Sequence, residues 1–170
     1  MGNRTFIAHS PLGEQLEFRS MEGTEQLSRL FEFRVRLLSD SPSISAKSLL
    51  GKDMSIEIDL TTEDAGSGKR FISGQVTQFT YIGRDGDFSA YQAVLRPWLW
   101  HATRRSDFKI FQFKKAPDII KEVLGKYGFS IEDKLMGNYR EWTYMVQYGE
   151  SDFNFVSRLM EEEGIFYFFS

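Results

Sequence analysis

The sequence contains no cysteine and only two histidines among its 170 residues. Without cysteine there is no disulfide framework, no thiolate metal site and no thiol nucleophile. His9 and His101 are far apart in the sequence, and neither lies in an HExxH or similar metal-binding motif. A zinc site needs three or four ligands. The sequence therefore predicts no metal, no cofactor and no catalytic residue.

Neither sign of charge dominates, and long apolar runs are absent. The chain has 21 basic and 24 acidic residues, so its formal net charge of -3 gives no net attraction to nucleic acid or anionic lipid. The longest apolar run, Ile165–Phe169, is far shorter than the roughly 20 residues of a membrane span. Residues 1–10 contain no stretch of signal-peptide length. We expect no stable membrane insertion, no nucleic-acid partner and synthesis in the cytosol.

Aromatic residues are abundant, with 16 phenylalanines and an aromatic fraction of 15%. Such residues favour pleated surfaces, and the first hundred residues show the period-two alternation of β-strands. A turn signal at 83–87 predicts a hairpin, and a slip in the apolar phase between Val76 and Phe79 predicts a bulge. Residues 62–69 are typical of a loop. The expected strands, at 4–8, 14–19, 31–37, 54–60, 70–82 and 88–95, indicate a closed or nearly closed antiparallel barrel.

After Pro97 the pattern changes to helices mixed with short strands. A helix is predicted from Ala116, with its apolar stripe at Ile119, Ile120, Val123, Leu124 and Tyr127 and a glycine cap at Gly128. A second helix is predicted to begin at Ser151-Asp152 and to end at Gly164. Short strands are expected at 129–131, 142–148 and 164–170. The fold class is thus mainly β with an α/β part: an antiparallel β-barrel at 1–104 and a smaller α/β segment with two helices at 105–170.

Two enzyme-like or ligand-like patterns have simpler explanations. The run Glu161–Glu163 and the distant Asp152 do not form a carboxylate pair that converges across a cleft, as glycoside hydrolysis requires. Instead, the run is interpreted as a solvated helix face, on which Arg158 and Glu162, four residues apart in the less favourable order, could pair weakly. The basic stretch 96–115 contains aromatics that would suit single-stranded nucleic acid, but those aromatics occupy expected core positions. We therefore favour an assembly module, with an enzyme acting on cell-wall glycan as the alternative.

Several segments, taken in order, resemble the N-terminal part of VgrG, the spike protein of bacterial type VI secretion systems. The resemblance runs from about Phe6 to Phe169, and its most specific blocks are PWLW and QYGESDFNFVSRLMEEEG. The matching segments are 27–33, 49–52, 70–76, 91–100, 110–112 with 117–120, and 147–165.

The resemblance implies a baseplate hub like that of contractile-tailed phages. Such hubs are homotrimers with two related barrels per subunit, and the resulting ring is implied to sit on the hexameric Hcp tube. Effectors or adaptors are implied to bind through further C-terminal domains, and the spike is implied to be assembled in the bacterial cytoplasm and expelled by sheath contraction without a signal peptide. On this resemblance the chain is not an enzyme. It would contain the first barrel and would stop before the second is complete.

Overall fold

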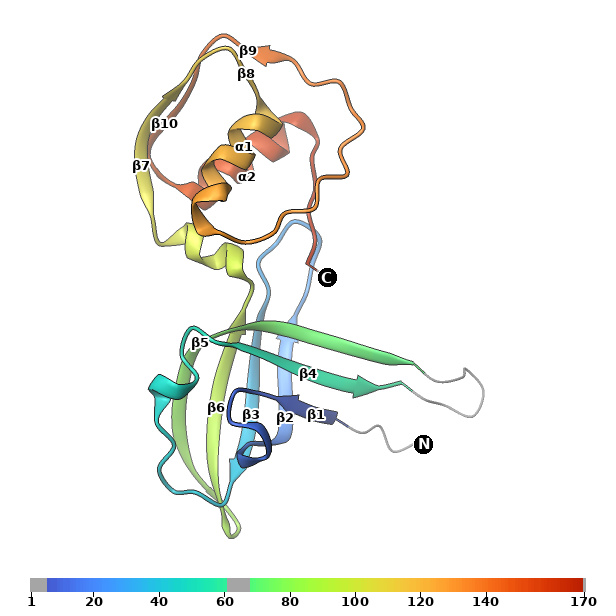
Figure 1. Ribbon diagram of the computed structural model, residues 1–170, viewed down its shortest axis with the longest axis vertical. Coiled ribbons are helices and arrows are strands. Elements are labelled where there is room, and N and C mark those ends of the chain that lie inside the picture. The colour runs from blue at the N-terminus through green and yellow to red at the C-terminus, as the bar shows by residue number, and fades with distance from the viewer. Residues whose placement is uncertain (1–5, 61–67, 170) are drawn as a thin grey trace. The chain divides into compact units, whose positions relative to one another are not determined.

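The computed structural model describes residues 6–60 and 68–169 (Figure 1). These residues divide into two compact units. The first unit contains the described residues up to Glu25 together with Leu30–Pro97. The second contains Gln26–Arg29 and the described residues from Trp98 onward.

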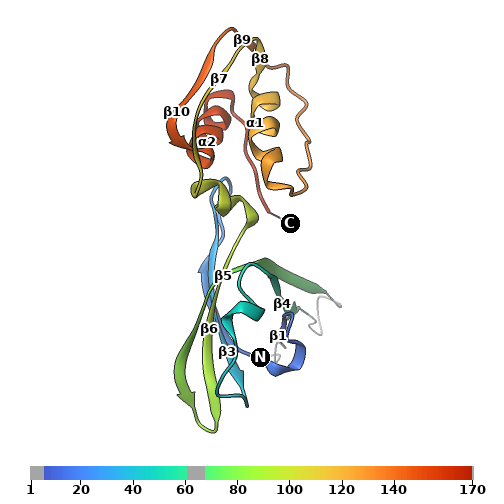
Figure 2. The ribbon, with the colours of Figure 1, turned by 60° about the vertical axis from the view of Figure 1, so that its left-hand side comes forward.

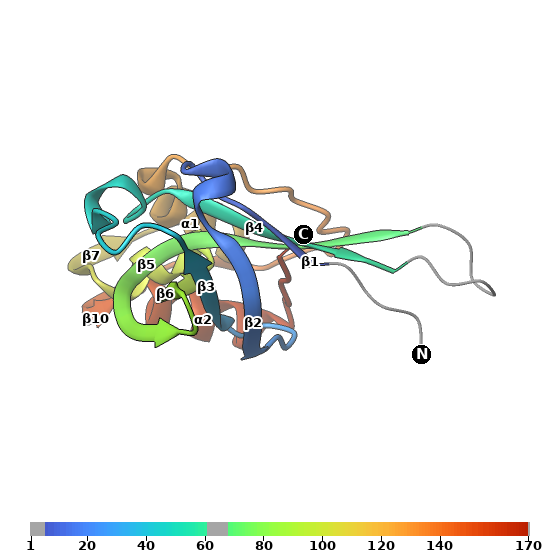
Figure 3. The ribbon, with the colours of Figure 1, turned by 90° about the horizontal axis from the view of Figure 1, so that it is seen from below.

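The first unit is one curled antiparallel sheet of six strands (Figures 1 and 3). Short 3₁₀ turns, η1 (Gly13–Gln15) and η2 (Ala46–Ser48), lie in its connections. The order across the sheet is β1-β4-β5-β6-β3-β2. The strands are β1 (Phe6–His9), β2 (Glu17–Thr24), β3 (Glu32–Ser39), β4 (Asp53–Asp59), β5 (Lys69–Asp85) and β6 (Phe88–Arg96).

The two end strands of this sheet meet through side chains. The rings of Phe6 on β1 and Phe18 on β2 are stacked, with centroids 5.0 Å apart. Within the described residues, β1 is hydrogen-bonded to β4 and β2 to β3, and no ladder joins β1 to β2. The sheet is therefore a curled half-barrel, which confirms the mainly antiparallel β class expected from the alternation.

One face of the curled sheet forms the core of the first unit. Val35 and Leu37 on β3 and Ile56 on β4 are completely buried, as the period-two pattern predicts. Tyr91 on β6 is also buried, and its hydroxyl donates to the carbonyl oxygen of Ser41 at 2.9 Å. The ring thus fills the core while its polar end fastens the loop after β3.

The β5–β6 hairpin follows the predicted turn and bulge. Asp85 pairs with Phe88, so Gly86 and Asp87 form a two-residue loop, and Gly86 has the positive φ of 62° that tight hairpins need. The register shifts between Val76 and Gln78, which confirms the bulge. A second shift, between Tyr81 and Gly83, was not anticipated.

An ion pair fixes the first bulge in place. Thr77, the extra residue, donates from Oγ1 to the carbonyl oxygen of Val94 at 3.1 Å and accepts from Arg96 at 2.8 Å. Arg96 also donates from Nε to Glu32 at 3.0 Å, and this bond lowers the pKa of the Glu32 carboxyl. Three strands, β3, β5 and β6, are therefore joined where the first unit ends.

The second unit has two helices on one face of a two-stranded sheet (Figure 2). Strand β7 pairs with β10, and the shorter β8 pairs with β9, both antiparallel. The rings of Phe111 and Phe155 stack at 5.5 Å between the sheet and the second helix. Its elements are η3 (Trp98–Thr103), β7 (Ser106–Phe111), β8 (Lys114–Lys115), α1 (Ala116–Leu124), η4 (Gly125–Tyr127), β9 (Glu141–Trp142), β10 (Met145–Ser151) and α2 (Asp152–Glu163).

Both predicted helices are confirmed together with their caps. The apolar stripe of α1 is buried from Ala116 to Leu124, and Gly128 takes the left-handed conformation that ends η4. The Ser151 hydroxyl accepts from the backbone N–H of Asn154 at 3.1 Å and caps α2. Gly164, with φ 68°, ends that helix.

Three strand predictions were wrong in part or whole. Residues 129–131 form no strand, because the Phe129 ring instead stacks on half-buried Trp98 at 5.1 Å. The segment Ile165–Phe169 has no ladder partner, although the backbone N–H of Ser28 donates to Tyr167 at 2.9 Å. The strand expected at 142–148 is split into β9 and β10 by residues 143–144.

Other boundaries moved by a few residues. The strand expected at 14–19 begins at Glu17, because Gly13–Gln15 forms a 3₁₀ turn, and it continues to Thr24. Residues 4–5 of the first predicted strand and residues 62–67 of the predicted loop lie outside the described residues.

Replacing Gly23 by alanine should destabilise the first unit. A Cβ at this position would lie 2.5 Å from the carbonyl oxygen of Glu32 and closer still to the ring of Phe33. Such overpacking costs about 1–3 kcal/mol. Urea denaturation monitored by circular dichroism would measure the loss. As a matched control, Gly68→Ala should change the free energy of unfolding little, because its nearest neighbour is 3.9 Å away. Equal effects for the two variants would contradict the clash.

Candidate functional site

The QYGESDF motif forms the turn from β10 into α2. Gly149 has a φ of 65°, and the β7–β10 register shifts between Tyr148 and Ser151. Gln147 faces inward from the regular ladder opposite Lys109, and Asp152 follows the bulge; neither side chain is accessible to solvent. The motif therefore places a carboxylate in the interior of the second unit.

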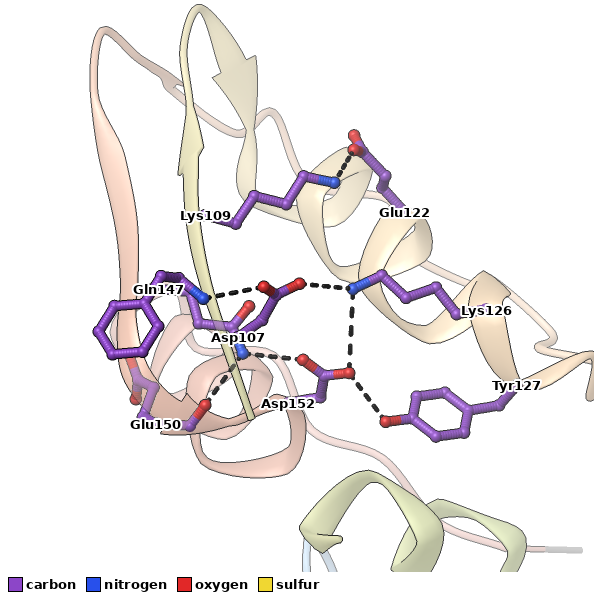
Figure 4. Close-up of polar contacts among 9 residues, drawn as sticks. Asp107, Lys109, Glu122, Lys126, Tyr127, Gln147, Glu150 and Asp152 are labelled. Carbon is purple, nitrogen blue, oxygen red and sulfur yellow. Dashed lines mark hydrogen bonds and ion pairs between the residues drawn. The ribbon is translucent and has the colours of Figure 1, made fainter. Parts of the chain in front are cut away.

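Three side chains surround the Asp152 carboxylate (Figure 4), and a carbonyl oxygen binds its backbone. Gln147 Nε2 donates to one carboxylate oxygen and the Tyr127 hydroxyl donates to the other, each at 2.8 Å. Lys126 Nζ lies 4.0 Å from the second oxygen. The backbone N–H of Asp152 donates to the carbonyl oxygen of Arg105 at 2.8 Å. One buried residue thus joins β10, α2, η4 and the residue that precedes β7.

The polar partners of Asp152 are held in fixed roles. Burial, and then the hydrogen bond to Asp152, raise the pKa of the Tyr127 hydroxyl, which therefore stays protonated and donates. Gln147 also donates to the carbonyl oxygen of Glu150 at 3.1 Å. Since Asp152 lies in the first turn of α2, the positive end of the helix dipole also favours its charge.

Ion pairs extend this cluster along α1. Lys109 on β7 lies 2.7 Å from Glu122, and Lys114 on β8 binds the other oxygen of the same carboxylate. These two bonds lower the pKa of Glu122 to about 2. Lys126 lies 3.4 Å from Asp107, whose pKa is lowered first by the N–H of Phe108 and then by this lysine. Helix α1 is therefore tied to the sheet by charge as well as by its apolar stripe.

Arg158 and Glu162 do not form the weak surface pair that their spacing allowed. Arg158 instead binds Glu150 with two nitrogens, at 3.0 and 2.7 Å, and the carbonyl oxygen of Val146 at 2.6 Å. Glu162 binds Arg140 at 2.8 Å. The bulge brings Glu150 close to α2, and a two-nitrogen contact outweighs a weak pair along the helix surface.

The acidic residues do not form a pair suited to glycoside cleavage. Asp152 and Glu161 are nine residues apart on one straight helix, which separates them by about 13 Å along the axis. Known pairs lie about 5–9.5 Å apart. Glu163 accepts from the indole nitrogen of Trp142 at 2.9 Å and also faces Arg140. These contacts are those of a structural network.

The two histidines lie in different units and in ordinary contacts. His9 is 2.8 Å from Glu57, which also binds Lys69, and His101 packs edge-on against Trp100. Across residues 6–60 and 68–169, no three histidine, aspartate or glutamate side chains gather in a way that could hold a metal ion. No helix in that part of the chain is long and apolar enough to cross a membrane.

The basic stretch 96–115 is divided among internal ion pairs. Arg96 binds Glu32, and Lys109 and Lys114 share Glu122. Arg104 lies over the Trp100 ring at 4.7 Å. The stretch therefore does not present a continuous row of free cations, which single-stranded nucleic acid would need. The expectation that the aromatics of this stretch lie in the core holds for buried Phe111 but was wrong for Phe108 and Phe113, which are exposed.

Sequence reasoning missed the partners of the buried carboxylate. The helical spacing assigns Tyr127 to the apolar stripe of the first predicted helix, and the motif that contains Gln147 gives it no predicted partner. A tyrosine at the end of an apolar stripe has a polar tip that requires a partner, which is the signal that could have identified it. That its partner would be Asp152, 25 residues later, depends on the packing of α1 against α2.

Replacing Asp152 by alanine should destabilise the second unit by about 1–3 kcal/mol, because the half-buried Tyr127 hydroxyl would lose its acceptor and the buried Gln147 amide would keep only the carbonyl oxygen of Glu150. Thermal and urea unfolding of the variant would measure this. The matched control is Glu161→Ala, which removes an exposed carboxylate from the same helix. The control should lie within about 0.5 kcal/mol of the parent. A stable Asp152 variant would show that the cluster does not hold this unit together.

Glu122→Gln should remove an acid-dependent part of the stability. The folded pKa of about 2 is below the ordinary 4.5, so the ion pairs stabilise the fold above pH 4.5 and this contribution is lost as the pH falls toward 2. Since the Glu122 side chain is 35% exposed, solvent screening reduces the expected contribution to about 1 kcal/mol at neutral pH.

Urea titrations of parent and Glu122→Gln at several pH values would measure the difference. The gap between their free energies of unfolding should close as the pH is lowered from about 4.5. Glu132→Gln, which alters an exposed carboxylate paired only with exposed Lys134, is the matched control and should show no such gap. A gap that stays constant with pH would contradict the assignment.

Comparisons with known proteins agree on one family. The phage tail baseplate hub (GPD) family matches residues 24–170. The chain is 49% identical over 162 residues to the type VI secretion system spike protein VgrG1c of Pseudomonas aeruginosa, and 47% identical over 161 residues to VgrG1a of the same organism. Each match covers 94% of this chain but only 22% and 24% of those relatives. The chain thus spans about a fifth to a quarter of their length.

Solved structures share the fold. An E. coli component of the type VI secretion system, described as similar to the T4 bacteriophage tail proteins gp27 and gp5, superposes with a TM-score of 0.76 at 28% identity. That match covers 91% of this chain and 42% of the other. A 43 kDa prophage tail protein from Shewanella oneidensis, 13% identical, superposes with a TM-score of 0.62 over 95% of this chain and 49% of its own. The chain belongs to the phage tail baseplate hub family and is a homologue of the type VI secretion spike proteins VgrG.

Proposed function

We propose that this chain is a structural part of a type VI secretion spike and acts as the hub that joins a trimeric needle to the hexameric Hcp tube. The observation that carries the proposal is the 47–49% identity, over 94% of the chain, to proteins described as type VI spike proteins. In the full-length protein the hub would be a homotrimer. It would be assembled in the bacterial cytoplasm and expelled when the sheath contracts, with effectors or adaptors carried by other domains.

The internal contacts suit a part that transmits force. A hub must keep its shape while a tube pushes on it. Within each unit, polar contacts join separate helices and strands. In the first unit, Arg96 joins β3, β5 and β6 through Glu32 and Thr77. In the second, Asp152 and Glu122 hold helices to strands. Buried or multiply bonded networks of this kind resist local opening more than isolated surface pairs do.

We further propose that the chain is not an enzyme and that its two parts, 1–104 and 105–170, serve as a barrel-like hub domain and an α/β segment. The alternative, an enzyme acting on cell-wall glycan, would need two converging carboxylates. Asp152 is instead buried behind Gln147 and Tyr127, and the glutamates at the end of α2 bind Arg140 and Trp142.

Deleting residues 6–169 from the full-length protein should abolish export of Hcp, because the needle would lose its connection to the tube. Export would be followed by the amount of Hcp in the culture medium of a strain that depends on this protein. The full-length protein with Glu161→Ala is the control and should support normal export. Immunoblotting of cells must show that the deleted protein accumulates. Unimpaired export by an accumulating deletion protein would overturn the proposal.

A further inference from the structure

Two irregularities of the six-stranded sheet lie at nearly the same level. The pairing of β2 with β3 shifts so that Arg19 is an extra residue, and the pairing of β5 with β6 shifts so that Ile82 is extra. Both shifts adjoin the row of the sheet that contains Leu37. Bulges change the direction of a side chain and are over-represented next to functional sites, which makes the surface between them a candidate site.

A hollow of about 180 Å³ lies between these two bulges, and all four strands contribute to its lining. Leu38 of β3 and Ala90 of β6, which pair across the ladder, are part of it. They lie on the side of the sheet opposite the core, since their neighbours Leu37 and Tyr91 are buried. We call it the arginine hollow, because its charged lining consists of Arg19, Arg36, Arg84 and Asp85.

The arginine hollow is positive although the chain is acidic overall. Its three arginines face a single carboxylate, whereas the whole chain has a formal net charge of -3. Guanidinium groups are effectively always protonated in proteins. The excess of positive charge at this surface is therefore permanent.

Contacts within the chain use few of the donors at the arginine hollow. Arg19 donates from Nε to Asp85 at 3.0 Å, and Arg84 donates from Nη2 to the carbonyl oxygen of Asp87 at 2.9 Å. The Arg36 side chain has no hydrogen bond or ion pair with any described residue. Since each guanidinium has five N–H donors, most of the donors at this surface remain available.

The pair between Arg19 and Asp85 holds one of these arginines in place. In the sheet order β5-β6-β3-β2 the two residues lie on strands three spacings apart, about 14 Å at roughly 4.8 Å per spacing. The two side chains therefore reach toward each other across β3 and β6, and both line the arginine hollow. A group that is already held in position loses less freedom when a ligand binds.

We infer that the arginine hollow binds a carboxylate side chain of a partner protein. The inference goes beyond the proposed function and does not depend on it. Guanidinium and carboxylate groups form two parallel N–H···O bonds, which are shorter and stronger than bonds between neutral groups. Arg36, whose donors have no partner among the described residues, is the residue that we expect to make this contact.

A second hollow, which shares Leu38 with the first, determines the kind of anion that fits. It has a volume of about 350 Å³, and its charged lining consists of Glu14, Glu17 and Asp40. A nucleic acid or an anionic membrane repeats its negative charge, so part of that charge would face these carboxylates. A protein segment can instead place an acidic side chain at the arginine hollow and a basic side chain at the acidic one. The charge pattern therefore fits a segment in which acidic and basic residues lie close together.

The test uses the peptide acetyl-Gly-Glu-Ala-Lys-Gly-amide and the isotope-labelled chain. Nuclear magnetic resonance of the arginine Nε–Hε groups would follow binding. The resonance of Arg36 should shift most and should saturate at millimolar peptide, because a single carboxylate contact at an exposed surface is weak. The same peptide with Gln in place of Glu should leave this resonance unchanged.

Two variants of β3 separate a site from an effect of net charge. Arg36→Gln should weaken peptide binding severalfold, as measured by the backbone amide shifts of Leu38 and Ala90. The matched control is Arg34→Gln, which removes an equal charge from the same side of the same strand, where Arg34 is paired with Glu32 at 3.1 Å. The control should bind the peptide like the parent. Circular dichroism would confirm that both variants are folded.

The acidic hollow is tested in the same way. A peptide with Gln in place of Lys should bind the parent more weakly than the first peptide does. The double variant Glu17→Gln with Asp40→Asn should remove this difference between the two peptides, because it removes the charges that the lysine meets.

Three outcomes would overturn the inference. The first is an Arg36 resonance that does not shift at tens of millimolar peptide. The second is an equal loss of affinity in the Arg36 and Arg34 variants, which would mean that only net charge matters. The third is tighter binding of oligothymidylate or of phosphatidylserine vesicles than of the peptide. None of these outcomes bears on the proposed function, which the deletion of residues 6–169 tests.

Discussion

The second unit depends on one buried carboxylate. Asp152 has no contact with solvent, yet it accepts hydrogen bonds from Gln147 and Tyr127 and lies near Lys126. A charge removed from water is costly unless it is paired and hydrogen-bonded, so these elements must pack in one arrangement. The bulge at Gly149 makes this possible, because it turns the motif inward immediately before α2 begins. Packing, helix capping and charge thus converge on a single turn.

The first unit also has a polar network at an irregular position, the β-bulge at Thr77. Thr77 is the extra residue in β5, and a bulge left alone would disturb the ladder and expose backbone groups. Arg96 bonds both to Thr77 and to Glu32, so the irregularity is held between two strands rather than left to vary. In each unit, therefore, a polar network lies at a place where regular structure is interrupted. For a proposed mechanical part, this gives a fixed curvature and a fixed helix position.

The register of the β7–β10 ladder decides which residues of the second unit's sheet face the helices. Asp107, Lys109 and Gln147 face the helices together with buried Phe111 and Met145, so the alternate residues, Phe108 and Ile110 on β7 and Val146 and Tyr148 on β10, face outward. The polar network that stabilises the unit and the exposure of Phe108 and Tyr148 are thus two consequences of the same register. Shifting either strand by one residue would bury Phe108 and Tyr148 and would expose the network.

The sequence by itself determined the class of fold, both helices with their caps, and the hairpin and bulge near Val76, because these depend on local periodicity and on residues such as Ser151, Gly128 and Gly86. The resemblance in its ordered motifs also pointed to the family. Only the tertiary structure decided that Arg158 binds Glu150, that Tyr127 reaches Asp152, and which face of β10 is covered. Period-two alternation identifies a strand but does not say which of its faces meets the helices. That choice depends on long-range packing, here on the burial of one carboxylate.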